Sequence, residues 1–125
     1  MRLSEDLRER TKRFASGIIQ LYVALPRRRK EVEILGNQLL RSGTSVAAHA
    51  REASRARSDT EFCSKLDGLL QEADESQLWL ELLPEDCAIR DGQLTHLHAE
   101  AEEVLAIFAT IVAKIRRDPG ENLKS

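Results

Sequence analysis

The sequence predicts an all-α protein that folds as an antiparallel, up-down-up-down four-helix bundle. Composition gives the first indication, since 42% of the 125 residues are hydrophobic and 32% are charged, but only 4% are aromatic. Such a chain is rich in helix formers and poor in strand formers. Four long segments then repeat apolar residues in steps of three and four, which is typical of amphipathic helices. Short connections between the segments favour antiparallel neighbours.

The first helix is predicted from Ser4 to Leu25. Ser4 is a suitable amino-terminal cap, and Glu5 and Asp6 are favourable near the positive end of the helix dipole. Pro26 ends the helix, because proline disfavours helical backbone in the residue before it. The stripe expected to face the core consists of Leu7, Thr11, Phe14, Ile18, Leu21 and Leu25.

The second helix is predicted from Lys30 to Arg57. Its core stripe consists of Val32, Leu35, Leu39, Ser42, Val46, His49 and Ala53. Beside this stripe runs a row of small residues, namely Gly36, Gly43, Ala47 and Ala50. A glycine inside a helix costs about 1 kcal/mol relative to alanine. We therefore expect the backbone of a neighbouring helix to approach closely at Gly43.

The third helix is predicted to begin at the capping box Ser58-Asp59-Thr60-Glu61 and to end at Leu83, before Pro84. Its core stripe consists of Phe62, Leu66, Leu69, Ala73, Leu80 and Leu83. Trp79 and Leu82 are apolar but lie off this stripe.

The fourth helix is predicted from Gln93 to Arg117, with Asp91 near its start and Asp118-Pro119-Gly120 as its stop signal. Its stripe consists of Leu94, Leu97, Ala101, Val104, Phe108, Ile111 and Ile115, widened by Leu105 and Val112. Residues 1–118 are therefore expected to form one bundle domain, and residues 119–125 a frayed tail.

Length and residue usage also indicate a cytoplasmic protein. A domain of this length buries enough surface to fold without disulfides or a metal. Cys63 and Cys87 are far apart in the sequence and form no C-x-x-C motif, so we expect two reduced, buried thiols. The amino end is charged at once and has no apolar leader, and no apolar run approaches the ~18 residues that a membrane span needs.

Charge is distributed unevenly along the chain. Residues 1–57 hold 13 Lys/Arg and 6 Asp/Glu, a net charge of +7, whereas residues 58–125 hold 6 and 15, a net charge of −9. The basic half suggests a polyanionic partner, and the split itself suggests complementary hairpins or subunits.

Two basic clusters are candidate nucleic-acid-binding sites, and each has an alternative explanation. The first is Arg27-Arg28-Arg29-Lys30, four adjacent cations that would bind phosphates by releasing counterions, or would form a solvated turn. The second consists of Arg51, Arg55 and Arg57, which would bind phosphates or pair with the acidic third and fourth helices. About 40 Å of helix separates the clusters, at roughly 1.5 Å per residue. No aromatic residues interleave with either cluster, so base stacking is not supported.

The second and third predicted helices carry motifs that resemble a known family. Residues 38–53 read QLLRSGTSVAAHAREA, and they are followed by FCSKL at residues 62–66 and LWLELL at residues 78–83. These motifs resemble the bacterial four-helix-bundle family encoded by intervening sequences in large-subunit ribosomal RNA genes. That family includes the accessory variability protein of diversity-generating retroelements. The resemblance implies a barrel-like homopentamer without enzymatic activity and, for the retroelement branch, binding of RNA and a reverse transcriptase.

Several apolar residues outside the core stripes predict self-association independently. These candidate interface residues are Ile19, Tyr22 and Val23 on the first helix and Trp79 and Leu82 on the third. Arg41 belongs to the family motif, and we expect it to have a carboxylate partner within the chain or across a subunit contact.

The histidines provide little support for an enzyme. His49 follows Ser45 by four residues, but the sequence offers neither an orienting acid nor an oxyanion hole. His98 and Glu102 share a helix face, whereas His96 and His98 point in opposite directions, and no Glu-x-x-His motif is present. We therefore predict no catalytic residue, no metal and no cofactor. The expected function is that of a homo-oligomeric interaction protein that binds structured RNA or another polyanion; the alternative is an assembly scaffold without nucleic-acid affinity.

Overall fold

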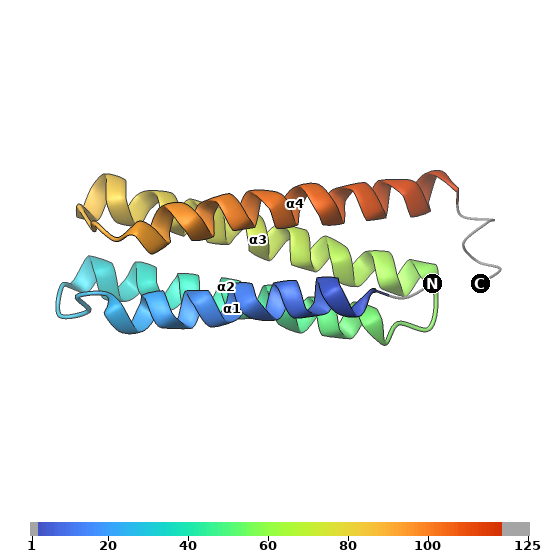
Figure 1. Cartoon of the computed structure of the whole chain (residues 1–125), viewed down its shortest axis with the longest axis horizontal. Helices are drawn as coiled ribbons and strands as arrows, with labels where there is room; N and C mark the ends of the chain where they lie inside the picture. Colours follow the sequence, from blue (N-terminus) through green and yellow to red (C-terminus); the bar gives the residue numbers. More distant parts are fainter. Residues whose placement is uncertain (1–2, 119–125) are drawn as a thin grey trace.

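The computed structural model describes residues 3–118, and within this range the predicted all-α four-helix bundle is confirmed. Its helices are α1 (Glu5–Ala24), α2 (Lys30–Ser54), α3 (Asp59–Cys87) and α4 (Gly92–Arg117). Each helix runs back alongside the one before it, so the α1–α2 and α3–α4 turns lie at one end and the α2–α3 connection at the other (Figure 1). The predicted tail, residues 119–125, lies outside the described residues.

Three of the four helices begin at a side-chain cap, as the sequence predicts. Ser4 caps α1 and Asp91 caps α4. At α3, the Ser58 hydroxyl accepts a hydrogen bond from the Glu61 backbone N–H at 3.1 Å. The Glu61 carboxylate then accepts one from the backbone N–H of Arg57, also at 3.1 Å. This bond reaches one residue beyond the usual capping box, so the motif fixes both the start of α3 and the chain entering it.

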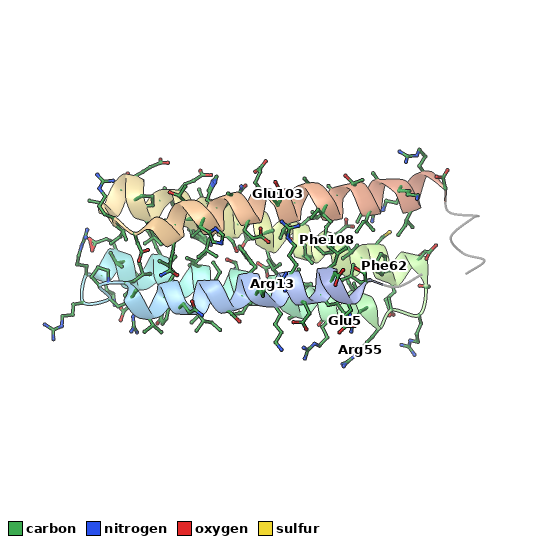
Figure 2. The ribbon with its side chains drawn as sticks, in the orientation of Figure 1. Glu5, Arg13, Arg55, Phe62, Glu103 and Phe108 are labelled. Atoms are coloured by element: carbon green, nitrogen blue, oxygen red, sulfur yellow. The ribbon has the colours of Figure 1, made fainter. Side chains whose placement is uncertain are left out.

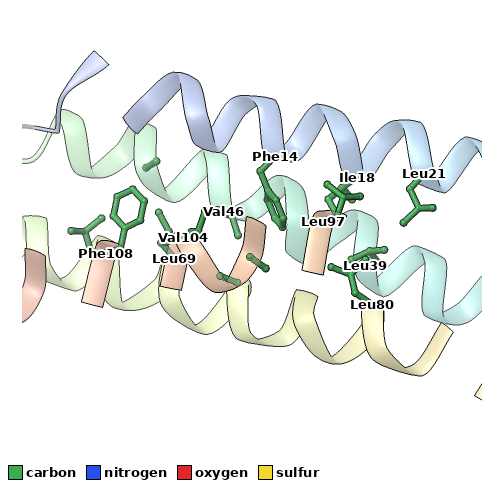
Figure 3. Close-up of a cluster of buried hydrophobic side chains, with 14 of the residues drawn as sticks. Phe14, Ile18, Leu21, Leu39, Val46, Leu69, Leu80, Leu97, Val104 and Phe108 are labelled. Atoms are coloured by element: carbon green, nitrogen blue, oxygen red, sulfur yellow. The ribbon is translucent and has the colours of Figure 1, made fainter. Parts of the chain in front are cut away.

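The core is a continuous apolar column along the bundle axis. Figure 3 shows side chains from all four helices meeting there, including Phe14, Ile18 and Leu21 from α1, Leu39 and Val46 from α2, Leu69 and Leu80 from α3, and Leu97, Val104 and Phe108 from α4. Fully burying side chains of this kind stabilises a fold by about 1.5–3 kcal/mol each. The predicted stripes therefore account for most of the stabilising burial.

One polar contact crosses the core between α2 and α3. The hydroxyls of Ser42 and Ser76 are both fully buried and lie 2.8 Å apart. Each hydroxyl has a single proton, so one serine donates to the other, and the second donates to a carbonyl of its own helix, Leu39 or Glu72. Both buried groups are thereby satisfied without disturbing the apolar packing.

Gly43 permits a close helix contact, although the contacting group differs from the prediction. A Cβ at this position would lie 2.7 Å from Cγ1 of Ile18, which is fully buried. At Gly36 a Cβ would lie 3.1 Å from Cδ1 of Leu25. The small residues of α2 thus make room for side chains of the first hairpin rather than for the backbone of α1.

The prediction that the third helix ends before Pro84 is wrong, because α3 continues to Cys87. Inside a helix, proline removes one hydrogen-bond donor and its ring crowds the carbonyl four residues earlier, so other contacts must favour the continuation. Ala88 then adopts a left-handed conformation with φ 57°, and the backbone N–H of Ile89 donates to the Leu83 carbonyl at 3.1 Å. This closure buries both Cys87 and Ile89, and that burial offsets the lost helical bond.

The end of α2 and the burial of several stripe positions also differ from expectation. α2 ends at Ser54 rather than Arg57, since the chain tightens there into bonds from Arg55 to Glu52 and from Ala56 to Ala53. Several predicted stripe positions are half-buried and are replaced in the core by their neighbours. Leu7, Leu35, His49 and Ile111 lie at the edges of the bundle, while Ala50 and Val112 are buried.

Packing is uneven around the bundle. Among the four pairs of neighbouring helices, α2 and α3 share the most extensive interface and α1 and α4 the smallest. Across the α1–α4 seam, the Arg10 guanidinium donates to both carboxylate oxygens of Glu100, at 2.7 and 3.0 Å. These hydrogen bonds lower the pKa of Glu100 and raise that of Arg10. A bidentate ion pair therefore reinforces the seam with the least packing.

Candidate nucleic-acid interface

The predicted Arg27–Lys30 cluster forms the turn between α1 and α2. Most of its side chains already contact other groups of the same chain. The Arg27 guanidinium lies 4.5 Å from the ring centroid of Tyr22, a cation–π arrangement. Arg29 donates to the Cys87 carbonyl at 2.8 Å and so ties this turn to the end of α3. Among the described residues, only Arg28 of the four makes no ion pair, hydrogen bond or ring contact through its side chain.

Lys30 completes the turn, with its ammonium 3.4 Å from the Glu33 carboxylate. Arg29 also has a carboxylate neighbour, Glu31, at 3.4 Å. Each of these pairs brings a negative charge next to the cluster. The turn is therefore a structural junction between the two hairpins, and its charge is partly neutralised locally.

The second predicted cluster lies at the opposite end of α2, beside a groove of about 850 Å³. This groove runs between the first half of α1 and the last turns of α2. Figure 2 shows Glu5 and Arg55 at this end of the bundle. Ala47 and Ala48 contribute small side chains to its lining, and its charged lining consists of Glu5, Arg8, Glu9, Lys12, Arg51, Glu52, Arg55, Arg57 and Glu61.

The alternative explanation for Arg51, Arg55 and Arg57, pairing with the acidic third and fourth helices, is not seen within one chain. Within residues 3–118, none of these three side chains lies within 4.0 Å of a carboxylate oxygen. The groove carboxylates of α2 and α3 have other partners instead. Glu52 contacts His49 at 3.0 Å and Lys65 at 3.8 Å, and Glu61 accepts the Arg57 backbone N–H.

Arg8 and Lys12 were not among the predicted site residues, yet they line the same groove. They are one helical turn apart on α1, and Arg51 and the C-cap residue Arg55 have the same spacing at the end of α2, so two pairs of cations border one groove. Neither Arg8 nor Lys12 forms an ion pair with any described residue. The i,i+4 spacing of Arg8 and Lys12 was a visible signal, but only the antiparallel hairpin brings them beside the end of α2.

Arg41 has the carboxylate partners that the sequence led us to expect. Its guanidinium contacts Glu72 at 3.2 Å and Glu75 at 2.9 Å, both on α3. The hydrogen bond to Glu72 is the main cause of a raised Arg41 pKa. Arg41 thus ties α2 to α3 within one chain.

The predicted interface residues occupy two different environments. Ile19 and Val23 on α1 are 45% and 65% exposed. Tyr22 is less available, because its hydroxyl donates to Asn37 at 2.8 Å and its ring lies under Arg27.

Trp79 and Leu82 on α3 are half-buried, next to Leu78, which is 45% exposed. The Trp79 indole N–H is buried and has no hydrogen-bond partner among the described residues. Both α1 and α3 therefore present apolar surface outside the core.

Two of the histidines contact carboxylates, His49 within α2 and His98 between α4 and α3. His49 contacts Glu52 through Nδ1 rather than Ser45. His98 contacts Glu81 on α3 at 2.8 Å, while Glu102 accepts a bond from Gln77 at 2.7 Å. Among residues 3–118, no three His, Cys, Asp or Glu side chains are grouped so that they would hold a metal ion. The described helices also include none that is long and apolar enough to cross a bilayer.

Comparison with known proteins identifies the family. The model of the 23S rRNA-intervening sequence protein family matches residues 5–110. A crystal structure at 1.70 Å resolution, of a protein of unknown function from the S23 ribosomal protein family of Bacteroides thetaiotaomicron, is also similar. The two chains are 32% identical over 85% of this chain and 97% of the other, with a TM-score of 0.76. No functionally curated protein matches. The chain therefore belongs to the 23S rRNA-intervening sequence protein family, as its motifs predicted.

Proposed function

We propose that this protein is a non-enzymatic homo-oligomer that binds structured RNA through the groove between α1 and α2. The observation that supports this proposal is the set of five cations around that groove, against four carboxylates in the same lining; none of the five side chains forms an ion pair within the described chain. They are Arg8, Lys12, Arg51, Arg55 and Arg57. An unpaired surface cation is available to displace a counterion from a phosphate.

The arrangement of the cations also suits a polyanion better than a small ion. Arg8 and Lys12 on α1 border one side of the groove, and Arg51 and Arg55 on α2 border the other. Within each pair the side chains are one helical turn apart, about 6 Å along the helix axis. Successive phosphates along a nucleic-acid strand are spaced comparably, so several contacts can form at once.

Binding of a structured RNA at two salt concentrations tests this proposal. Wild-type protein should bind at low salt and lose affinity steeply as salt increases. The Arg51→Gln/Arg55→Gln variant should bind at least about tenfold more weakly. Its slope of log affinity against log salt should be smaller by about 1.4–1.8, which corresponds to two lost phosphate contacts.

A matched control is the Arg27→Gln/Arg28→Gln variant, which removes the same charge from the other end of the bundle. It should bind within about threefold of wild type, since distant charges are screened beyond ~10 Å at 0.1 M salt. Equal losses for the two variants would mean that only overall charge matters. Loss confined to the control would move the site to the α1–α2 turn.

Assembly without nucleic-acid binding is the second candidate function, and the apolar surface outside the core favours it. We propose that Ile19 and Val23 on α1, and Trp79 and Leu82 on α3, contact neighbouring subunits, with five subunits expected from the family resemblance. Light scattering should then give about five times the 14.1 kDa of the chain. A monomer would contradict the assembly, and an oligomer with no RNA affinity at low salt would leave a scaffold.

A further inference from the structure

α1 carries basic side chains on both of its flanks. Arg8 and Lys12 face the groove shared with α2. On the opposite flank, Arg10, Arg13 and His96 line a second groove, of about 650 Å³, between α1 and α4. Figure 2 shows Arg13 on α1, near the middle of the bundle. A ligand lying across α1 would therefore meet basic side chains on either side.

The second groove contains more basic side chains than its single carboxylate can neutralise. Both oxygens of Glu100 are occupied by Arg10. That bond is the main cause of the lowered Glu100 pKa, and the nearby charges of His96 and Arg13 lower it further. Arg13 itself has no carboxylate oxygen within 4.0 Å in the described part of the chain. It therefore remains available to an external anion.

An exposed carboxylate lies between the two flanks. With ~100° per residue in an α-helix, Glu9 is roughly 60° from Lys12 on one side and about 40° from Arg13 on the other. Glu9 is exposed and has no ion pair within residues 3–118. Glu9 also lines the α1–α2 groove, together with Glu5, so the surface of α1 between Lys12 and Arg13 carries carboxylates. A carboxylate repels phosphate but accepts hydrogen bonds from hydroxyl groups.

We infer that α1 docks across the minor groove of a double-stranded RNA stem; this rests on the proposed RNA-binding function. The minor groove of A-form RNA is wide and shallow, and it presents ribose 2′-hydroxyls between two phosphate strands. Lys12 and the α2 cations contact one strand, Arg13 contacts the other, and Glu9 accepts hydrogen bonds from the 2′-hydroxyls between them. This placement matches each type of side chain to a chemical group of the duplex.

The position of the aromatic side chains also favours a duplex over a single strand. Proteins that bind single-stranded RNA stack unpaired bases on exposed aromatic rings. Phe14, Phe62 and Phe108 are buried in the core, and the Tyr22 ring lies under Arg27 at the turn. Neither groove beside α1 is lined by an exposed aromatic ring. Recognition by shape, phosphates and 2′-hydroxyls is what this surface offers.

Fluorescence anisotropy with three probes tests the inference. The probes are an RNA duplex longer than about 16 base pairs, a DNA duplex of the same sequence, and one strand of the RNA alone. The RNA duplex should bind most tightly. Arg13→Gln should weaken binding of the RNA duplex severalfold and reduce its salt slope by about 0.7–0.9, while affinity for the single strand changes less.

Two substitutions of Glu9 test its role separately from phosphate attraction. Glu9→Ala removes the acceptor, so the ratio of RNA-duplex to DNA-duplex affinity should fall by about two- to tenfold, the range of one hydrogen bond. Glu9→Gln removes the same charge but keeps an acceptor oxygen, so this ratio should stay close to wild type. Arg28→Gln, at the distant turn, is the matched control and should change neither quantity.

Equal affinity for the RNA duplex and the single strand, or an Arg13→Gln variant that binds like wild type, would overturn the inference. If Arg51→Gln/Arg55→Gln still weakened binding, the proposed function would stand and the site would be confined to the α1–α2 groove. If none of the three probes bound at low salt, the proposed function itself would fail.

Discussion

The two ends of α2 carry basic clusters that look equivalent in the sequence but differ in the structure. At the start of α2, Arg27, Arg29 and Lys30 have an aromatic ring, a backbone carbonyl and carboxylates as partners. At its end, Arg51 and Arg55 face a groove and have no ion pair within residues 3–118. The Arg27–Lys30 cluster thus helps to hold the two hairpins together, whereas the side chains of Arg51 and Arg55 form no ion pair within the described residues.

The difference shows that the partners of a cation matter more than its neighbours in the sequence. Four adjacent basic residues repel one another, and contacts with an aromatic ring, a carbonyl and carboxylates reduce that repulsion. Like charges one helical turn apart also repel, but by only about 0.2–0.5 kcal/mol, so such cations can remain unpaired on an exposed helix surface. The side chains of Arg51 and Arg55 are therefore the better candidates for an external anion.

The largest expected effect comes from neutralising the whole groove. The variant Arg8→Gln/Lys12→Gln/Arg51→Gln/Arg55→Gln should lose about a hundred- to thousandfold in RNA affinity at 0.1 M salt, since up to four phosphate contacts disappear. Anisotropy titrations would measure this loss. A variant that kept wild-type affinity would show that the groove is not the site, and circular dichroism would confirm that the helices are retained.

Substitutions in the Arg27–Lys30 cluster should affect folding stability more than substitutions in the groove, the reverse of their expected effects on RNA affinity. Arg29→Gln removes the hydrogen bond to the Cys87 carbonyl, and we expect it to lower the free energy of unfolding by about 1 kcal/mol. Arg55→Gln breaks no contact within the described chain and should change stability by less than about 0.5 kcal/mol. Urea denaturation would measure both. Equal losses of unfolding free energy in the two variants would contradict the difference in contacts between the two clusters.

A comparable effect is expected at Glu100, whose pKa is lowered mainly by its hydrogen bonds to Arg10. A carboxyl with a lowered pKa in the folded state stabilises the fold above its unfolded pKa, about 4.3. This stabilisation is lost as the pH falls through the folded pKa. Glu100→Gln should thus cost about 1 kcal/mol at pH 7 and progressively less below about pH 4.3. A cost independent of pH would contradict the ion pair at the α1–α4 seam.

The smallest effect is expected at Tyr22. Tyr22→Phe removes the exposed hydrogen bond to Asn37 but leaves the ring under Arg27. The loss should be about 0.5 kcal/mol, at the lower end for a single hydrogen bond. Tyr22→Ala removes the ring as well and should cost more, so thermal denaturation of the two variants would separate the hydrogen bond from the cation–π contact.

Most of the fold could be predicted because apolar spacing and caps are local signals. Ser4, Ser58 and Asp91 mark helix starts whatever the rest of the chain does. The continuation of α3 past Pro84 could not be predicted in the same way. It depends on burying Ile89 in the core, a tertiary contact that overrides the local preference of proline.

The candidate site was predictable only in part, for a related reason. Arg51 and Arg55 were visible from their spacing, but the presence of Arg8 and Lys12 beside them depends on the register of α1 against α2. The contact between Arg29 and Cys87 spans 58 positions of sequence. No local pattern indicates that this arginine is occupied while Arg55 is not.

Lysine acetylation followed by mass spectrometry tests the central claim most directly, because each region contains one lysine. Lys12 lies in the groove, and Lys30 lies at the turn with its side chain 81% exposed. When a structured RNA is added, acetylation of Lys12 should slow severalfold while that of Lys30 is unchanged. Protection of Lys30 with Lys12 unaffected would contradict the assignment of RNA binding to the α1–α2 groove.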